Sequence, residues 1–237
     1  MKRQIQLSLL ISFIATIMIP LSLFAQDSED GFVSIFNGKD LSGWVGDERI
    51  WSVQDGAIVG TTDNESKKLT YNTFLAYQEN LSDFIVRFDI RLSKEGNSGL
   101  NYRSWILDNG NAYQLGGYQA DFDGQANYSG IMYGEQFRGI LAQTGTISRI
   151  GNNHQPEEMT RFATAEEIRE NVNIENWNSY EIIARGFVFI HKINGKITSV
   201  CIDEDNEARR PNGILAIQAH VGPPMKVEVK NIRLKKL

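Results

Sequence analysis

Residues 84–92 alternate strictly between two kinds of side chain, and this alternation is the strongest constraint on what the chain can fold into. Every second residue is a large apolar one, and polar or charged residues fill most of the positions between them: Phe84, Val86, Phe88, Ile90 and Leu92 against Ile85, Arg87, Asp89 and Arg91. A period of two predicts a β-strand with one face on a core and the other in water. Strands of this kind are typical of antiparallel sheets.

The rest of the chain repeats this style at shorter length. About a dozen short strands separated by turn signals such as Asp55-Gly56 and Asn194-Gly195 predict an antiparallel sandwich or barrel. Residues 143–163 show little periodicity and are expected to form a long loop. One short helix is expected from Thr164 to about Asn171, because Thr164 and Glu167 have the spacing of a capping box. With no internal repeat and no Pro- or Ser-rich linker, residues 31–237 are predicted to form a single domain.

The first residues resemble a targeting segment rather than part of the fold. Lys2 and Arg3 precede an apolar run from Leu7 to Leu23, and Phe24-Ala25 then leads into polar sequence. This order predicts a secretory signal peptide over residues 1–25, with cleavage after Ala25. The alternative is an uncleaved membrane anchor, for which the run is near the lower length limit. We therefore expect a secreted or periplasmic protein, with no membrane association once the segment is removed.

Composition excludes several other classes of protein. The formal net charge is −5 with no long basic run, which gives no electrostatic footprint for nucleic-acid binding. The single cysteine, Cys201, lies between Val200 and Ile202 and is expected to be a small buried residue rather than a nucleophile. The sequence also lacks a P-loop, a dinucleotide-binding glycine motif, an H-E-x-x-H helix and a G-x-S-x-G elbow.

Paired polar residues follow apolar strand positions in three separate places. They are Asn101 with Arg103, Gln119 with Asp121, and Gln218 with His220. In each strand the alternate residues are apolar, so the polar pairs should share the face that points away from the core. If the strands are neighbours, they would line one concave face with amides, a carboxylate, an imidazole and a guanidinium. Such an inventory suits hydroxyl-rich ligands, and it includes a base and a cation for chemistry.

Each of these residues also has a purely structural interpretation. His220 would then be a satisfied structural histidine, and Asp121 would cap the turn at Asp123-Gly124. Arg103 would pair with Asp89, while Gln119 and Gln218 would be ordinary sheet-surface residues. Glu135 and Arg138, which follow Tyr133-Gly134, would be solvated loop residues. The other two histidines, His154 and His191, have no supporting pattern, and His191 is expected to be exposed.

An ordered series of short motifs resembles the 3-keto-disaccharide hydrolase family, once described only as a domain of unknown function. The series spans nearly the whole chain after the targeting segment: Asn37-Gly38-Lys39-Asp40-Leu41-Ser42-Gly43-Trp44, Trp51, Asn97-Ser98-Gly99, Tyr102-Arg103, Gly117-Tyr118-Gln119-Ala120-Asp121, Trp177-Asn178 and Gln218-Ala219-His220-Val221-Gly222. The resemblance implies a concanavalin A-like jelly-roll sandwich of two antiparallel sheets, secreted by bacteria that degrade glycans, with a carbohydrate as ligand. One departure is Gly117, where many members carry a Glu before the Tyr-Gln step. Asp121 or Glu135 could take its place.

The resemblance also implies a reaction. A ketone at C3 of a sugar acidifies the C2 proton, so a base can remove it and the C1 substituent can leave by elimination, with or without later addition of water. Arg103, Asp121, Glu135 and His220 are the expected catalytic residues, and Asn101, Tyr102, Gln119, Arg138 and Gln218 the expected substrate-binding ones. Arg103, or a divalent metal ion held by Asp121 and His220, would stabilise the oxyanion. The alternative function is a non-catalytic carbohydrate-binding module or lectin, because fold does not settle function.

Overall fold

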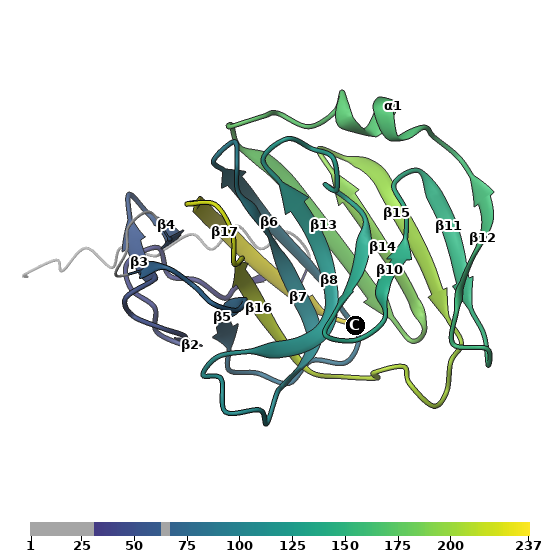
Figure 1. The fold of residues 1–237 in the computed structure, drawn as a ribbon, viewed down its shortest axis with the longest axis horizontal. Helices are drawn as coiled ribbons and strands as arrows, with labels where there is room; N and C mark the ends of the chain where they lie inside the picture. The colour runs from purple at the N-terminus through teal and green to yellow at the C-terminus, as the bar shows by residue number, and fades with distance from the viewer. Residues whose placement is uncertain (1–30, 63–66) are drawn as a thin grey trace, which may run out of the picture.

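Two β-sheets packed face to face make up almost all of the protein. The structure, a computed structural model, describes residues 31–62 and 67–237, and it confirms the predicted all-β sandwich with one short helix (Figure 1). The predicted signal peptide, residues 1–25, lies outside the described residues. Within the described ranges, no helix is long and apolar enough to cross a membrane.

The larger sheet has ten strands. Its order is β12–β11–β15–β14–β13–β6–β17–β4–β3, and β1 pairs with the far end of β17. All pairs are antiparallel except β11 with β15. The strands are β1 (Val33–Ser34), β3 (Trp51–Gln54), β4 (Ala57–Thr61), β6 (Phe84–Leu92), β11 (Thr146–Ile150), β12 (Pro156–Arg161), β13 (Asn178–Arg185), β14 (Val188–Ile193), β15 (Lys196–Asp203) and β17 (Lys226–Lys236).

The smaller sheet has seven antiparallel strands, in the order β10–β9–β8–β7–β16–β5–β2. They are β2 (Trp44–Val45), β5 (Thr73–Tyr77), β7 (Asn97–Ile106), β8 (Leu115–Asp123), β9 (Met132–Glu135), β10 (Gly139–Ala142) and β16 (Ile214–Ala219). The three strands that carry the paired polar residues, β7, β8 and β16, are therefore consecutive neighbours. In Figure 1 the short strands β2 to β5 lie at the left of the molecule, and β11 and β12 lie at the right.

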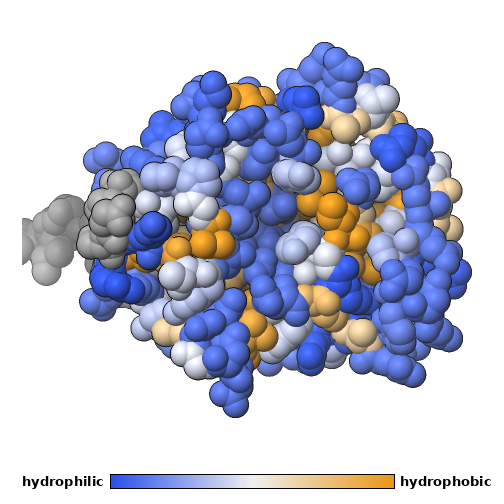
Figure 2. Space-filling model, viewed as in Figure 1, coloured by the Kyte–Doolittle hydropathy of each residue, from blue (hydrophilic) through white to orange (hydrophobic). Residues whose placement is uncertain are grey.

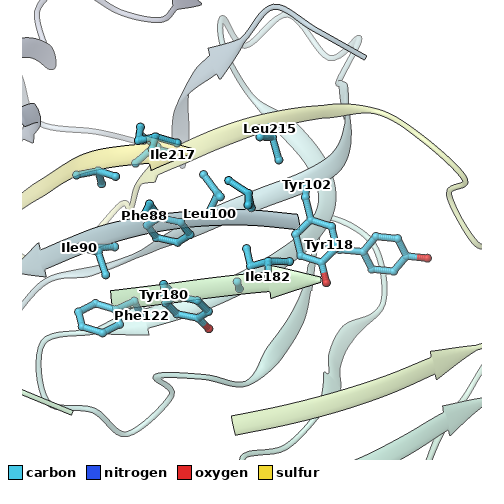
Figure 3. Close-up of a cluster of buried hydrophobic side chains, with 14 of the residues drawn as sticks. Phe88, Ile90, Leu100, Tyr102, Tyr118, Phe122, Tyr180, Ile182, Leu215 and Ile217 are labelled. Carbon is cyan, nitrogen blue, oxygen red and sulfur yellow. The ribbon is translucent and has the colours of Figure 1, made fainter. Parts of the chain in front are cut away.

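The core fills the space between the sheets with aliphatic and aromatic side chains (Figure 3). Tyr102 of β7 stacks on Tyr118 of β8 with ring centroids 5.6 Å apart, and both rings contact Phe189 of the larger sheet. In the view of Figure 2, hydrophilic residues dominate the outline and hydrophobic patches lie nearer the centre. Cys201 is fully buried, as its neighbours predicted.

His191 is buried in this core, so the expectation that it is exposed was wrong. Its Nδ1 lies 3.2 Å from the carbonyl oxygen of Ile131, and its Nε2 lies 3.0 Å from the Tyr102 hydroxyl. A carbonyl only accepts, so Nδ1 carries the proton and Nε2 accepts from Tyr102. Desolvation lowers the pKa of His191 to about 4, and the imidazole is therefore neutral at physiological pH.

Local sequence signals placed several elements correctly. Strand β6 has the predicted bounds, and its buried and part-exposed residues alternate along its whole length. The turns at Asp55-Gly56 and Asn194-Gly195 join β3 to β4 and β14 to β15. Helix α1 (Ala165–Arg169) begins with the predicted capping box, because Thr164 Oγ1 accepts from the Glu167 backbone and Glu167 accepts from the Thr164 backbone.

The predicted loop over residues 143–163 was wrong, because this segment forms β11 and β12. All six residues of β12 are exposed, so its sequence shows no apolar alternation. Its neighbour β11 is held by a parallel pairing with β15, from Thr146 opposite Ser199 to Ile150 opposite Asp203. Partners so distant in the chain leave no local signal.

Arg103 does not share a face with Asn101, which corrects the predicted alternation of β7. The β7–β8 register shifts between Tyr102 and Trp105, and Arg103 has a φ of 46°. This bulge turns the Arg103 side chain out of the outer face of the smaller sheet. Its guanidinium instead lies 5.0 Å from the ring centroid of Phe189, and the side chain is 1% exposed.

The Arg103 guanidinium ties the two sheets together at one end of the sandwich. It donates to the carbonyl oxygens of Ser82, Gly186 and Arg210 at 2.9, 2.8 and 3.1 Å. It also forms an ion pair with Asp83 at 2.9 Å, rather than with Asp89 as expected. Arg103 is therefore a structural residue that contacts the larger sheet, and it takes no part in an oxyanion site.

Replacing Arg103 by Met should destabilise the fold. The substitution leaves three backbone carbonyls without their donor, so we expect the free energy of unfolding to fall by roughly 3 kcal/mol. Urea denaturation followed by tryptophan fluorescence measures this change. Arg185→Met, at an exposed position of β13, is the matched control and should shift stability by no more than about 0.5 kcal/mol. Equal stability of the two variants would contradict the structural role.

Candidate functional site

A polar cavity of about 250 Å³ opens on the outer face of the smaller sheet. Its floor comes from alternate positions of β8 and β16, where the core side of each strand holds apolar residues. Five neighbouring strands and the loops at their ends supply its lining: Asn72, Asn97, Gln119, Asp121, Tyr128, Ile131, Tyr133, Glu135, Gln136, Ile140, Gln218 and His220. The structure thus brings together Gln119, Asp121, Glu135, Gln218 and His220, all of which the sequence singled out.

A chain of side-chain hydrogen bonds crosses this cavity and ends on Glu135. Gln119 Nε2 donates to Gln218 Oε1 at 3.0 Å, and Gln218 Nε2 donates to Glu135 Oε2 at 3.3 Å. Asn72 Nδ2 donates to Glu135 Oε1 at 3.1 Å, while the backbone N–H of Val221 fixes the Asn72 oxygen at 2.9 Å. Glu135 is 3% exposed, so it is not a solvated loop acid. Both of its oxygens are oriented by amides, and each keeps acceptor capacity for a ligand.

Asp121 is a buried acid with a raised pKa. Its side chain is 7% exposed, and no hydrogen bond reaches its carboxyl group from the described residues. Desolvation raises the pKa of Asp121 well above its usual value, and the nearby charges of Asp123 and Glu135 raise it further. A buried carboxylic acid next to a second carboxylate suits a proton donor.

The predicted turn cap is Asp123 rather than Asp121. The Asp123 carboxylate accepts from the backbone N–H groups of Asn127, Tyr128 and Ser129 at 3.0, 2.8 and 2.9 Å. These bonds fix the loop after β8 and hold Tyr128 at the edge of the polar cavity. Tyr128 is 52% exposed, which leaves its ring available to a ligand.

The surroundings of Gly117 leave no space for a Glu side chain at this position, directly before Tyr118-Gln119. A Cβ atom there would lie 2.3 Å from the Ser104 hydroxyl oxygen, because the β7 bulge pushes Ser104 against β8. Glu135 is the cross-strand partner of Gly117 in the β8–β9 register. A carboxylate therefore enters the cavity from the adjacent position of the next strand.

Four predicted site residues do not reach the polar cavity. Arg103 contacts the larger sheet, as described above, and Tyr102 lies in the core on the opposite face of β7. Arg138 forms ion pairs with Asp203 and Asp205, and its side chain is 10% exposed. Asn101 lies on the correct face, between Gln119 and Ala216, but it is fully buried and does not line the cavity. Tyr102 and Arg138 do not line the polar cavity, because the Tyr102 hydroxyl is paired with His191 and the two terminal nitrogens of Arg138 are paired with Asp203 and Asp205.

Sequence reasoning missed Asn72, Tyr128 and Tyr133. Asn72 lies just before the short strand β5, and its role depends on a partner 63 residues away in the chain. Tyr133 occupies the same face of β9 as Glu135, so the period of two could have placed it beside that acid. Tyr128 belongs to a loop, where periodicity carries no information.

The side chains of the polar cavity can be compared with those that a divalent metal ion at Asp121 and His220 would need. Among residues 31–62 and 67–237, no group of three or more His, Cys, Asp or Glu side chains has a geometry that could hold one. Asp121 and His220 therefore lack a third ligand of these types in the described part of the chain. We derive no step of the reaction through a metal ion.

A two-sheet jelly-roll sandwich with amides and acids on the outer face of one sheet is an arrangement that carbohydrate-active and carbohydrate-binding proteins use. Residues 31–235 match the 3-keto-α-glucoside-1,2-lyase-like domain, and the chain belongs to that family. No curated protein matches the chain.

Solved structures share the fold at low sequence identity. A protein of Parabacteroides distasonis, provisionally described as a glycosyl hydrolase, is 19% identical over 91% of this chain and 98% of its own, with a TM-score of 0.59. The carbohydrate-binding module CBM66 of Bacillus subtilis is 14% identical over 82% and 96%, with a TM-score of 0.54. The β-glucanase of Bacillus licheniformis is 8% identical over 88% and 100%, with a TM-score of 0.52. At these identities the likeness establishes the fold alone.

Because the pKa of Asp121 is raised, the effect of Asp121→Asn on the free energy of unfolding should depend on pH. Between the usual Asp pKa of 3.8 and the raised value, the folded state holds a proton that the unfolded state has released. The contribution of Asp121 to the free energy of unfolding of the wild type is therefore present at low pH. It is lost as pH rises through this range, by about 1.4 kcal/mol per pH unit. Urea denaturation should show that the free energy of unfolding of Asp121→Asn, relative to that of the wild type, is higher at pH 8 than at pH 5. Asp108→Asn, at an exposed loop position, should show no such pH dependence, and a parallel response of both variants would contradict the assignment.

Proposed function

We propose that this protein cleaves 3-keto-glycosides by removing the C2 proton and eliminating the C1 substituent, with or without later hydration. The observation that carries the proposal is the polar cavity, where Asp121 with its raised pKa, an amide-fixed Glu135 and the imidazole of His220 lie together. The family supplies the substrate class, and the cavity supplies groups of the right chemistry. The neighbours with a glycan-related description share only the fold.

His220 is the proposed base. No side chain or backbone group of the described residues forms a hydrogen bond with its imidazole, which lies partly exposed where β16 ends. Imidazole is the commonest general base in enzymes. Glu135, by contrast, already accepts two amide hydrogen bonds, which hold both of its oxygens in place. Glu135 instead accepts hydroxyl groups of the sugar and orients the ring.

The electron pair of the C2–H bond first forms the enolate of the C3 ketone. Gln119 and Gln218 each use one amide N–H within the cavity, so each retains a second N–H for the ketone oxygen. The pair then forms the C1–C2 double bond while the C1–O bond breaks. Asp121 gives its proton to the departing oxygen, and water can add to C1 afterwards.

The proposal predicts that the effect of Asp121→Asn depends on the leaving group. A methyl 3-keto-glucoside expels a poor leaving group, so loss of the proton donor should slow it by about 100-fold or more. A p-nitrophenyl 3-keto-glucoside needs little protonation and should be slowed much less. Coupled sugar detection for the first substrate and nitrophenolate absorbance for the second give the rates.

Matched variants separate the two roles. His220→Ala should slow both substrates by a similar factor, because C2 proton removal precedes loss of either leaving group. His154→Ala and Asp108→Asn change the same residue types outside the cavity and should leave both rates unchanged. Equal losses on both substrates in Asp121→Asn would refute its role as the acid. Tight binding of unoxidised glycans by calorimetry, with no turnover of either 3-keto substrate, would replace the enzyme with a lectin-like function.

A further inference from the structure

A second cavity of about 620 Å³ lies on the same outer face of the smaller sheet, and its lining is mostly apolar. We name it the apolar cavity, and its apolar wall is formed by Val45, Phe74, Ala76, Ile106, Leu115 and Ile214. The volume lies within the range of about 300–1,000 Å³ that is usual for small-molecule sites. None of these residues belongs to the catalytic groups proposed above.

The apolar cavity and the polar cavity share strands and even register partners. Phe74 of the apolar cavity is directly opposite Gln218 of the polar cavity in the β5–β16 pairing. Leu115 and Gln119 lie on the same face of β8, four residues apart, which corresponds to roughly 13 Å along a strand. One small molecule with two dissimilar halves could therefore contact both cavities.

The loop between β7 and β8 supplies Ala112 and Tyr113 to the lining of the apolar cavity. Its residue Tyr113 has a φ of 56°, and its carbonyl oxygen accepts from the backbone N–H of Phe74 at 3.0 Å. That bond fixes the loop across the sheet to the β5 side. Ile106, Tyr113 and Val45 are 71%, 40% and 40% exposed, so large apolar side chains surround the opening.

The sheet beneath the two cavities contains buried polar groups that have no hydrogen-bond partner among the described residues. Asn101 lies between Gln119 and Ala216 in register, and neither atom of its amide has a hydrogen-bond partner among the described residues. Ser104, beside the β7 bulge, is also buried, and its hydroxyl has no hydrogen-bond partner among the described residues. Unsatisfied buried polar groups are costly and call for a partner. Asn101 is in register with Gln119 of the polar cavity, and Ser104 is in register with Ile214 of the apolar cavity, but both side chains are buried and line neither cavity.

From these observations we propose that the apolar cavity binds the aglycone of the substrate. The preferred substrates are then oxidised glycosides whose C1 substituent is an apolar group of aromatic size. A second sugar ring would place hydroxyl groups against Phe74, Ala76 and Leu115, whose side chains offer no hydrogen bond, which is unfavourable. This inference rests on the proposed function, because that function places the sugar in the polar cavity.

The test compares two substrates that differ in the size of the aglycone but not in the class of leaving group. Methyl and 2-phenylethyl 3-keto-α-glucoside both release a primary or simple alkyl alcohol, so protonation of the leaving oxygen affects them alike. We expect kcat/KM to be about tenfold higher for the 2-phenylethyl substrate. Equal values for the two substrates would overturn the proposal.

Variants of exposed apolar residues test whether the apolar cavity causes the preference for the 2-phenylethyl substrate. The double variant Val45→Ser/Ile106→Ser should reduce the ratio of the two kcat/KM values by about threefold or more, with the methyl substrate unchanged. Ile197→Ser, at a 41% exposed position on the larger sheet, is the matched control and should keep the wild-type ratio. A ratio that does not change in the double variant would overturn the proposal.

A binding measurement separates failure of this inference from failure of the proposed function. 2-Phenylethanol is titrated into the wild type and the double variant, and backbone amide shifts are followed by NMR. Saturable shifts near Leu115 and Ile214 that weaken in the double variant support the apolar cavity even if neither glycoside is turned over. In that case only the proposed function fails. Without saturable shifts there, the aglycone site is refuted, whatever the activity.

Discussion

The candidate site depends on the two-residue alternation of β8, whose nine residues are all buried. Tyr118, Ala120 and Phe122 enter the core, so Gln119 and Asp121 must face the other way. A shift of one residue would put Tyr118 into the cavity and two polar side chains into the core. The pairing of Gln119 with Asn101 and of Gly117 with Glu135 then fixes the neighbouring strands. Core packing therefore sets the positions of the site residues.

The polar cavity contains neutral amide donors and an acid with a raised pKa, Asp121, and no guanidinium of the described residues lines it. Arg103 and Arg138 both lie between the sheets, where they neutralise Asp83, Asp203 and Asp205. The cavity is left with amide N–H groups, which stabilise an oxyanion without adding a charge to the site. Burial of Asp121 near Glu135 raises the pKa of Asp121 and keeps its proton available. In the proposed reaction these two features replace the cation that the sequence suggested.

Much of this arrangement could be predicted from the sequence, and the failures have physical reasons. The period of two placed β6, and it put Gln119, Asp121, Gln218 and His220 on one face, because burial of alternate residues leaves a regular pattern. The same rule failed at Arg103, since a bulge inserts a residue without changing the composition of the strand. It failed at β12 because no residue of that strand is buried, and at His191 because Ile131 and Tyr102, its partners, are remote in the chain. The Asn72–Glu135 contact likewise links segments that no local pattern connects.

Strand β12 has a consequence for the behaviour of the protein in solution. It forms an open border of the larger sheet, where unpaired backbone groups are a template for pairing with another chain. Its sequence opposes such pairing, because Pro156 removes one N–H and Glu157, Glu158 and Arg161 surround the border with charge. In a parallel, in-register pairing of two copies along β12, Glu157 and Glu158 would lie beside the same residues of the other copy. The polar composition that left this strand without an apolar pattern therefore disfavours edge-to-edge pairing of the larger sheet.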